Sequence, residues 1–267
     1  MSLSGSGNMD LVLLGTGGPV SDGKRAASCT LVTGPEGHLL FDCGPGAGLR
    51  LGEVGLPAAK LDAIVLSHLH MDHCLELPSI VFGAFLQGRK DPMPVFGPVG
   101  TRALGENLFD RCFPYLSGLV KNVTKNDLRV EYHEYSESRL PVPGKLEVTS
   151  APVSHGNVSA YGFRVSNGQN SAAISGDSEP CEALVQLADS VDALVQDCAF
   201  PDSVGRVLGH TLPAGVGELA ARARPRRVIL THLFPACNGH ESEMLESVRK
   251  SFRGDVVIPR DLQRFSL

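Results

Sequence analysis

Short apolar runs separated by glycine-rich turns dominate the first part of the chain. They predict strands at 11–14, 29–33 and 38–42. Short apolar runs between glycine and proline turns are typical of strands joined by tight loops. A helix is expected next at 48–54, followed by a short buried strand at 63–66. A further helix is expected from about Asp72 to Phe85, so the opening predicts a meander of strands followed by helices.

The second half alternates strands and helices more regularly. The expected strands lie at 146–149, 161–165, 172–175, 193–196 and 228–230. The expected helices lie at 180–188 and 212–223. Two such halves predict an α/β fold of four layers, an αββα sandwich of two mixed β-sheets with helices outside. Residues 87–130 carry little periodic signal, and we expect a lid or a wall of the site there.

Length and composition favour one large domain. Hydrophobic residues make up 42% of the 267 residues and charged residues 20%, which is enough apolar material for a core. We expect a single domain over 10–267, preceded by a flexible segment 1–9 whose Ser/Gly-rich start resembles a tag remnant. The formal net charge of −5 argues against the broad basic surface by which proteins bind nucleic acids.

The cysteines and the apolar runs indicate the cellular compartment of the protein. Seven cysteines are scattered without any C-x-x-C pair, so neither a disulfide framework nor a cysteine-based zinc site is indicated. No apolar run approaches the length of a membrane span, and the N-terminal residues do not have the pattern of a signal peptide. We therefore expect a cytoplasmic protein with reduced thiols and no membrane partner.

Residues 68–73 read His-Leu-His-Met-Asp-His and directly follow the predicted strand at 63–66. Imidazole nitrogens and carboxylate oxygens are ligands for zinc and its first-row neighbours. The first two histidines of this segment can converge on one ion while the later aspartate and histidine face a second. The competing interpretation, a polar surface loop, does not explain four ligand-type side chains within six residues.

Four further residues repeat one local pattern, in which an apolar run leads into a single ligand-type side chain. They are His155, Asp177, His210 and His232. Strand ends at one edge of a sandwich converge in space, so these residues are expected to share a pocket with residues 68–73. Taken singly, His155 and His232 would be interpreted as hydrogen-bonded loop histidines. The remaining histidines, His38, His133 and His240, fit no such pattern.

Taken together, these motifs resemble the metallo-β-lactamase superfamily over nearly the whole chain. The matching segments are LLGTGGP at 13–19, LLFDCGPG at 39–46, SHLHMDH at 67–73, SGDS at 175–178, GHT at 209–211 and THL at 231–233. They are most similar to the ribonuclease Z branch and its phosphodiesterase and arylsulfatase relatives. The resemblance implies a zinc-dependent metallo-hydrolase with the four-layer fold expected above.

The resemblance also implies roles for individual residues. His68, His70 and His155 would hold one zinc ion, Asp72, His73 and His232 would hold the other, and Asp177 would bridge them. A hydroxide bridging two such ions can attack phosphorus or carbon. Asp72 would also orient or deprotonate the attacking water. Manganese and iron stay open as alternatives, because His/Asp ligands accept all three metals.

His210 is expected to act outside the metal ligands. In the ribonuclease Z branch the matching histidine can protonate the leaving oxygen, and Asp197 occupies the place of an acidic residue that holds it. We therefore expect His210 to be a general acid oriented by Asp197. The alternative is that His210 only caps the helix that opens at Leu212.

The residues around these side chains are expected to have structural roles. Gly15 to Gly18 precede a proline and no clear helix, so a tight turn at the rim of the site is expected in place of a phosphate-binding loop. The Asp42-Cys43-Gly44 segment is expected beneath the metals. Cys74 is expected to be a small buried side chain, and not a metal ligand.

One feature departs from the ribonuclease Z pattern. Enzymes of that branch that mature tRNA normally carry a long basic arm between the third histidine and the bridging aspartate. Here His155 and Asp177 are only 22 residues apart, which leaves room for two strands and a turn. The leading hypothesis is therefore a phosphodiesterase for a small phosphodiester or cyclic nucleotide. The alternatives are a tRNA 3′-processing endonuclease, and an arylsulfatase or lactonase on the same metal site.

The expected partners follow from these hypotheses. A small anionic substrate is the first expectation, because two divalent ions would make the pocket cationic inside an acidic protein. Nucleic acid is disfavoured, although RNA stays open, and the relatives suggest a homodimer as a candidate assembly. A purely structural role for the metals is disfavoured because all seven expected ligands are present.

Overall fold

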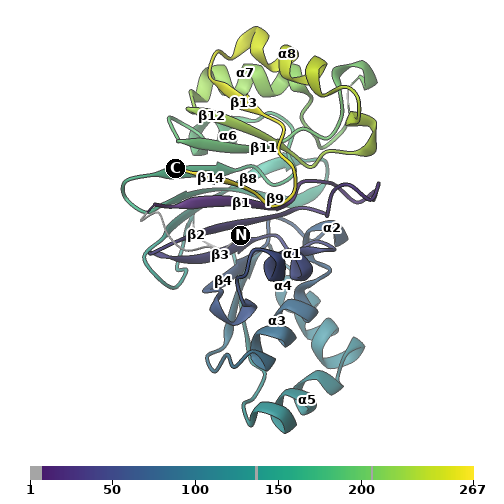
Figure 1. Ribbon diagram of the computed structural model, residues 1–267, viewed down its shortest axis with the longest axis vertical. Coiled ribbons are helices and arrows are strands. Elements are labelled where there is room, and N and C mark those ends of the chain that lie inside the picture. The colour runs from purple at the N-terminus through teal and green to yellow at the C-terminus, as the bar shows by residue number, and fades with distance from the viewer. Residues whose placement is uncertain (1–7, 136–137, 206) are drawn as a thin grey trace.

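The protein forms two seven-stranded sheets packed face to face, with helices on both outer faces (Figure 1). The computed structural model describes residues 8–135, 138–205 and 207–267. Within these ranges, the αββα sandwich expected from the sequence is confirmed. Of the expected flexible segment 1–9, residues 1–7 lie outside the described ranges, whereas Met9 is fully buried in the core.

The first sheet has the order β14-β1-β2-β3-β4-β5-β6. Its strands are β1 (Asp10–Gly15), β2 (Cys29–Gly34), β3 (Gly37–Phe41), β4 (Ala63–Val65), β5 (Met93–Gly97), β6 (Val130–Glu134) and β14 (Gln263–Ser266). The strands from β3 to β6 are parallel, whereas β14, β1, β2 and β3 alternate in direction. The last strand therefore pairs with the first, with Asp10 opposite Ser266.

The second sheet has the order β13-β12-β11-β10-β9-β8-β7. Its strands are β7 (Arg139–Leu140), β8 (Glu147–His155), β9 (Val158–Ser166), β10 (Ser171–Ile174), β11 (Ala193–Asp197), β12 (Arg227–Thr231) and β13 (Asp255–Val257). The strands from β10 to β13 are parallel, so their carboxyl ends lie at one edge. Ligands commonly bind at this edge in α/β proteins.

Helices cover each sheet on its outer side. The first sheet carries α1 (Ala47–Glu53), α2 (Met71–Cys74), α3 (Leu77–Leu86), α4 (Thr101–Glu106) and α5 (Tyr115–Thr124), with the short turn η1 (Ala58–Lys60) and the π-helical turn η2 (Asn107–Cys112). The second sheet carries α6 (Glu182–Leu187), α7 (Pro213–Ala223) and α8 (Glu241–Ser251), with the short turns η3 (Asp202–Val204) and η4 (Pro235–Cys237).

Alternate residues of one strand enter different hydrophobic layers. In β3, Leu40 packs in the layer beneath α1 and α3, whereas Leu39 and Phe41 pack between the two sheets. In β11, Leu194 packs beneath α6 and α7, whereas its neighbours face the first sheet. Because both faces of these strands are buried, they read as unbroken apolar runs. This is why the sequence located them well.

Two expectations about elements need correction. The helix expected over 72–85 is two helices, α2 and α3, with Pro78 in the first turn of α3, where its missing N–H costs nothing. The strand expected at 146–149 extends to His155, which is therefore the last residue of β8 and not part of a loop. The alternating burial of β8, at the side of the sheet, gave only a weak apolar signal.

Residues 87–130 were expected to form a lid or a wall, and this expectation is wrong for most of the segment. Strand β5 joins the first sheet between β4 and the edge strand β6, and Phe109, Leu116 and Val120 pack in the layer outside that sheet. The segment is part of the framework. None of the helices in the described ranges has the length and apolar character needed to cross a membrane.

The layer between the sheets is expected to carry much of the stability. The ring of Phe163 is almost fully buried there, 5.3 Å from the ring of Phe41 and 6.0 Å from that of Tyr135. Replacement of Phe163 by alanine should lower the free energy of unfolding by about 3–5 kcal/mol, because a cavity remains. Urea unfolding measures this loss. Val99→Ala, at a side chain that is 74% exposed, is the control, and equal midpoints for both variants would contradict the packing described here.

Candidate metal centre

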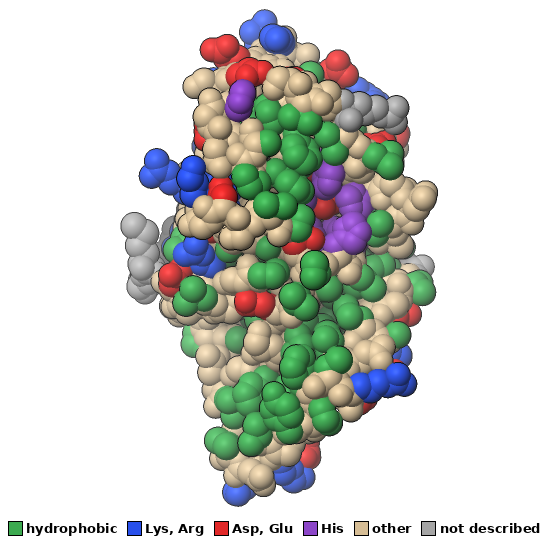
Figure 2. All heavy atoms as spheres, turned by 90° about the vertical axis from the view of Figure 1, so that its right-hand side faces the viewer, with side chains coloured by type: hydrophobic (Ala, Val, Ile, Leu, Met, Phe, Trp, Pro, Cys, Tyr) green, Lys and Arg blue, Asp and Glu red, His purple; other side chains and the backbone are tan. Residues whose placement is uncertain are grey.

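The expected ligand residues meet at one edge of the sandwich, where strands of both sheets end. His68 and His70 follow β4, and Asp72 and His73 lie in α2. The other ligands come from the second sheet: His155 ends β8, Asp177 follows β10 and His232 follows β12. Asp197, the expected partner of His210, ends β11 beside them. Figure 2 shows the histidines gathered on one face of the molecule, beside an area of hydrophobic side chains.

One group consists of His68, His70, His155 and Asp177, whose ligand-type atoms lie within 4.8 Å of one another. The Nδ1 atom of His70 lies 2.9 Å from Nε2 of His68 and 3.3 Å from Nε2 of His155. The Oδ2 atom of Asp177 is 3.8 Å from Nε2 of His68 and also from Nε2 of His155. His70 is exposed and the other three are buried, so this group opens toward solvent at His70.

A second group consists of Asp72, His73 and His232. The Oδ2 atom of Asp72 lies 3.1 Å from Nε2 of His232 and 3.6 Å from Nε2 of His73. Asp177 reaches this group as well, with 3.3 Å from its Oδ1 to Nε2 of His73 and 3.3 Å from its Oδ2 to Nε2 of His232. One buried carboxylate therefore touches both groups.

Hydrogen bonds orient two of these rings. The Nδ1–H of His73 donates to Asp42 at 2.7 Å, and the Nδ1–H of His155 donates to the carbonyl oxygen of Gly209 at 2.7 Å. Both rings then turn the lone pair of Nε2 toward Asp177. A partner on the far nitrogen is the usual arrangement for a metal-binding histidine. Asp42 also accepts hydrogen bonds from the backbone and the hydroxyl of Ser67, at 2.7 and 2.8 Å.

The donor set fits divalent metal ions. Among the described residues, Nε2 of His73 is a buried atom without a hydrogen-bond partner, and such an atom is costly unless something binds it. Imidazole nitrogens and carboxylate oxygens at this spacing suit zinc and its first-row neighbours. The two groups sharing Asp177 therefore have the composition of a two-ion site.

Burial and charge set the protonation of these ligands. Burial lowers the pKa of His68 far below its ordinary value, and the neighbouring His73 adds to the effect. Burial opposes ionisation of Asp177, but His232 and His73 outweigh it and hold the pKa of Asp177 well below its usual range. Burial likewise opposes charge on His73, but Asp177 and Asp42 raise the pKa of His73 well above its ordinary value.

His210 and Asp197 form a pair beside the second group. The Nδ1–H of His210 donates to Oδ2 of Asp197 at 3.0 Å, and Asp197 is fully buried. The ring of His210 lies nearly parallel to that of His232, with 5.2 Å between centroids. Burial lowers the pKa of His210, but the hydrogen bond to Asp197 and its charge outweigh this and raise it. A protonated His210 next to the ligand groups can deliver a proton.

The alternative role for His210 as a helix cap does not hold. Helix α7 begins at Pro213 with Leu212 as its capping position, and the first-turn N–H of Ala214 donates to Asp202 and not to His210. Asp197, His210, Asp177 and His232 would also be close enough to hold an ion. The direct hydrogen bond between Asp197 and His210, however, already occupies one atom of each.

Gly15 to Gly18 lie at the rim of the site, as expected, but their backbone is extended and does not form the expected tight turn. Gly17 forms bridges with Ala27 and Leu233. A Cβ atom at Gly18 would lie 2.8 Å from the ring of Phe234 and 3.1 Å from that of His232, so only glycine fits at this approach. Cys74 is buried and its thiol contacts the carbonyl oxygen of His70, as expected of a packed side chain.

Sequence reasoning missed the backbone partners of the site. The carbonyl of Gly209 orients His155, and Gly209 has φ +84°, where a Cβ would lie 2.8 Å from Nδ1 of His155. Its N–H donates to Glu179 at 2.9 Å. The glycine before His210 was the only available signal. His38, His133 and His240 belong to none of the ligand groups within the described ranges.

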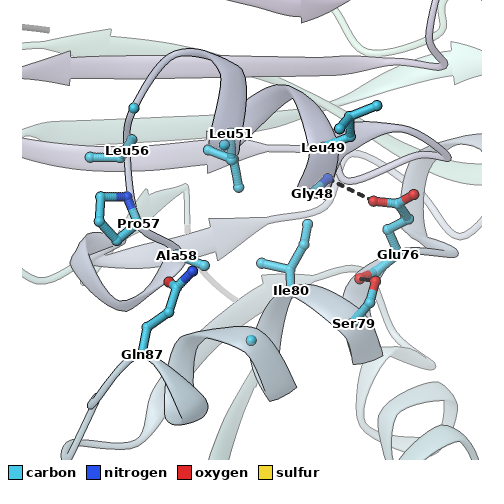
Figure 3. A pocket seen from close by; sticks show the side chains of 13 residues that line it. Gly48, Leu49, Leu51, Leu56, Pro57, Ala58, Glu76, Ser79, Ile80 and Gln87 are labelled. Atoms are coloured by element: carbon cyan, nitrogen blue, oxygen red, sulfur yellow. Dashed lines mark hydrogen bonds between the residues drawn. The ribbon is translucent and has the colours of Figure 1, made fainter. Parts of the chain in front are cut away.

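Two hollows lie on this side of the protein. The larger, about 840 Å³, is a groove between α1 and α3 lined by Leu51, Leu56 and Ile80 among others (Figure 3). Glu76 is the only titratable residue among the lining residues that the structure describes, and its carboxylate accepts N–H bonds from Gly46 and Gly48. This groove therefore has no catalytic chemistry. The smaller hollow, about 420 Å³, adjoins Asp72.

The comparisons with known proteins agree with this geometry. A family model described as "Beta-lactamase superfamily domain" matches residues 38–233. A curated protein named Ribonuclease Z from Mycobacterium bovis (strain BCG / Pasteur 1173P2) is 31% identical, over 96% of this chain and 97% of its own length.

Two solved structures share the fold. The metallo-beta-lactamase fold protein YhfI from Bacillus subtilis superposes with a TM-score of 0.81 at 21% identity, covering 97% of this chain and 99% of that one. The short form of human tRNase Z superposes with a TM-score of 0.75 at 24% identity, with the same coverage of 97% and 99%. With the family match and the full-length relative, these findings show that the chain belongs to the metallo-β-lactamase superfamily and is a ribonuclease Z-like member of it.

Proposed function

We propose that this protein is a dinuclear-metal phosphodiesterase that hydrolyses a small phosphodiester. The observation that carries the proposal is the position of Asp177, whose Oδ2 lies 3.8 Å from Nε2 of His155 in one group and 3.3 Å from Nε2 of His232 in the other. Its Oδ1 lies 3.3 Å from Nε2 of His73 in the second group. The hydrogen-bonded pair of His210 and Asp197 beside those groups adds a proton donor. A bridging carboxylate with an adjacent acid suits cleavage of an ester that has a poor leaving group.

The ligands follow from the two groups. His68, His70 and His155 would hold one ion, Asp72, His73 and His232 the other, and Asp177 would contact both. Zinc is the metal we propose, since imidazole and carboxylate ligands suit it, with manganese and iron as alternatives. When bound, such ions lower the pKa of a coordinated water and stabilise negative charge on the phosphoryl oxygens.

The chain's own residues supply the remaining functions. Asp42 and the Gly209 carbonyl hold His73 and His155 in one tautomer and one orientation. We assign to Asp72 the orientation of the attacking water, because it is the carboxylate of the more exposed ligand segment. His210, with its Nδ1–H engaged by Asp197, would give the proton on Nε2 to the leaving oxygen.

A small substrate is supported by the segment between His155 and Asp177. Strands β9 and β10 occupy 158–166 and 171–174, so the segment is used by the sheet and no long basic arm extends from it. Together with the net charge of −5, this favours a compact phosphodiester over a long polyanion. We further propose a cytoplasmic location, consistent with seven free cysteines.

Cleavage of precursor tRNA is the second candidate. It is favoured by the curated relatives named Ribonuclease Z, which align with 96% of this chain and 97% of their own length. RNA is therefore a candidate partner, and a homodimer would be one way to enlarge the binding surface.

Metal removal tests the proposed function. Chelation should abolish turnover of bis(4-nitrophenyl) phosphate, and zinc should restore it with two ions bound per chain, as measured by elemental analysis. Precursor tRNA, an aryl sulfate and a lactone are assayed beside it. Cleavage of the tRNA without turnover of the small diester would favour the second candidate, and turnover of only the sulfate or the lactone would refute both.

Asp42 offers a test of ligand orientation. Asp42→Asn should weaken metal binding by about 10- to 100-fold, because His73 loses the carboxylate that holds its Nδ1–H. Calorimetric titration of the metal-free protein with zinc measures this. Asp62→Asn is the matched control, since Asp62 accepts a backbone N–H of His38 away from the ligand groups. Equal affinities in the two variants would argue against the role of Asp42.

His210 offers a test of proton transfer. His210→Ala should lower kcat by about 10²- to 10⁴-fold for a diester with an alkoxide leaving group, and much less for a 4-nitrophenyl ester, whose leaving group needs no proton. His240→Ala, which removes an exposed histidine paired with Glu243, should leave both rates unchanged. If His210→Ala slowed both substrates equally, His210 would not be the acid.

A further inference from the structure

The hollow of about 420 Å³ beside Asp72 is the starting point, because it joins the metal centre to an unusual surface. Asp72 lines its inner end, and the hollow continues between α1, the C-terminal end of α2 and the rim loop that contains Gly18. Its volume lies within the range of small-molecule pockets. A group attached to the reacting phosphorus would enter it directly.

The lining is apolar although it is open to solvent. Leu49 of α1 is 68% exposed, Met71 of α2 is 63% exposed and Leu75, at the C-cap of α2, is 49% exposed. All three line this one hollow together with Pro19 and Pro45. Soluble proteins leave such contiguous apolar surface open mainly where something binds. In Figure 2 hydrophobic side chains lie beside the histidines on this face.

Two of the charged groups in the lining, those of Arg25 and Arg50, are used within the chain. Nη1 of Arg25 donates to the hydroxyl of Thr16 and the carbonyl of Pro259. Arg50 pairs with Glu53 and Asp261. The hydrogen bonds of these guanidinium groups therefore stabilise the rim. The exposed Lys24 is a further cation of the lining, whereas Leu49, Met71 and Leu75 offer the apolar surface that matches a neutral group.

The position of the hollow also indicates which part of a diester it would receive. Of the described residues, His210 and Asp197 are absent from its lining, whereas Asp72 is present. In hydrolysis, water adds to phosphorus, the bond from phosphorus to the leaving oxygen breaks, and the acid gives that oxygen its proton. The leaving group therefore has to lie at His210. The group in the hollow is the one that stays on phosphorus in the monoester product.

We propose that this hollow binds an apolar alkyl or aryl substituent that remains on the phosphoryl group, so that the natural substrate is a phosphodiester with a hydrophobic retained arm. The inference rests on the proposed phosphodiesterase function. It adds a hydrophobic retained arm to the small anionic substrate expected from the sequence. It predicts that kcat/KM rises with the hydrophobicity of the retained group, whatever the leaving group is.

A series of diesters with one leaving group tests the proposal. Methyl, butyl, hexyl and phenyl 4-nitrophenyl phosphates are compared by kcat/KM with the zinc-loaded protein. Each methylene that becomes fully buried raises the value by about fourfold, so partial burial predicts at least a tenfold rise from methyl to hexyl. Leu75→Ser should reduce this ratio of hexyl to methyl to below about threefold.

The matched control is Leu119→Ser on α5. Leu119 is exposed to a similar extent, 43% against 49% for Leu75, but it does not line the hollow as described. It should keep the wild-type ratio. Because each variant is judged by the ratio of two substrates, a general loss of metal or of folded protein cancels. Equal ratios in the Leu75 and Leu119 variants would overturn the proposal.

The outcomes separate the two levels of inference. If the methyl ester is hydrolysed but the series is flat, the phosphodiesterase stands and the apolar hollow is refuted. If zinc-loaded protein hydrolyses no member of the series, the phosphodiesterase is refuted and the retained-arm proposal falls with it. If kcat/KM rises with the size of the apolar group only when that group is on the leaving side, the assignment of the hollow to the retained arm is overturned.

Discussion

The fold depends at its functional edge on one buried carboxylate. Asp177 is almost inaccessible to solvent and faces imidazole nitrogens of four histidines within 3.8 Å. An ionised carboxylate in such a place is stable only if positive charge accompanies it. Either protons on the histidines or metal ions can supply that charge. The surrounding hydrogen bonds of Asp42, Ser67 and Gly209 hold the rings in place so that the metal ions can replace the protons.

The backbone contributes to this arrangement at some cost. Asp42 and His232 both have positive φ, 58° and 59°, a region that favours glycine. Each follows a buried strand and must turn its side chain sharply into the site. Such conformations persist when the surroundings determine them, and they collect at functional sites. The two rigid sheets thus hold Asp42 and His232 in these unfavourable backbone conformations where the ligands converge.

Much of the site could be predicted from the sequence because its residues follow buried strands with strong apolar signals. The cluster at 68–73 and the single residues Asp177 and His232 stand out against such runs. What could not be predicted depends on backbone atoms and long-range packing. The Gly209 carbonyl has no side-chain signal, and the strands β5, β6 and β14 are defined by the sheet they join. The apolar hollow is formed by side chains from separate helices, none of which signals it alone.

Pairing of β14 with β1 joins the two ends of the described fold. Asp261, just before β14, accepts hydrogen bonds from Thr16 and Ala26 at the rim, and the Arg50 side chain of α1 contacts it too. The rim therefore cannot close until residue 261 has been made. During synthesis on the ribosome, the metal ligands up to His232 emerge before the contacts that shape the entrance. Catalytic competence should thus arise only after β14 has emerged and paired with β1.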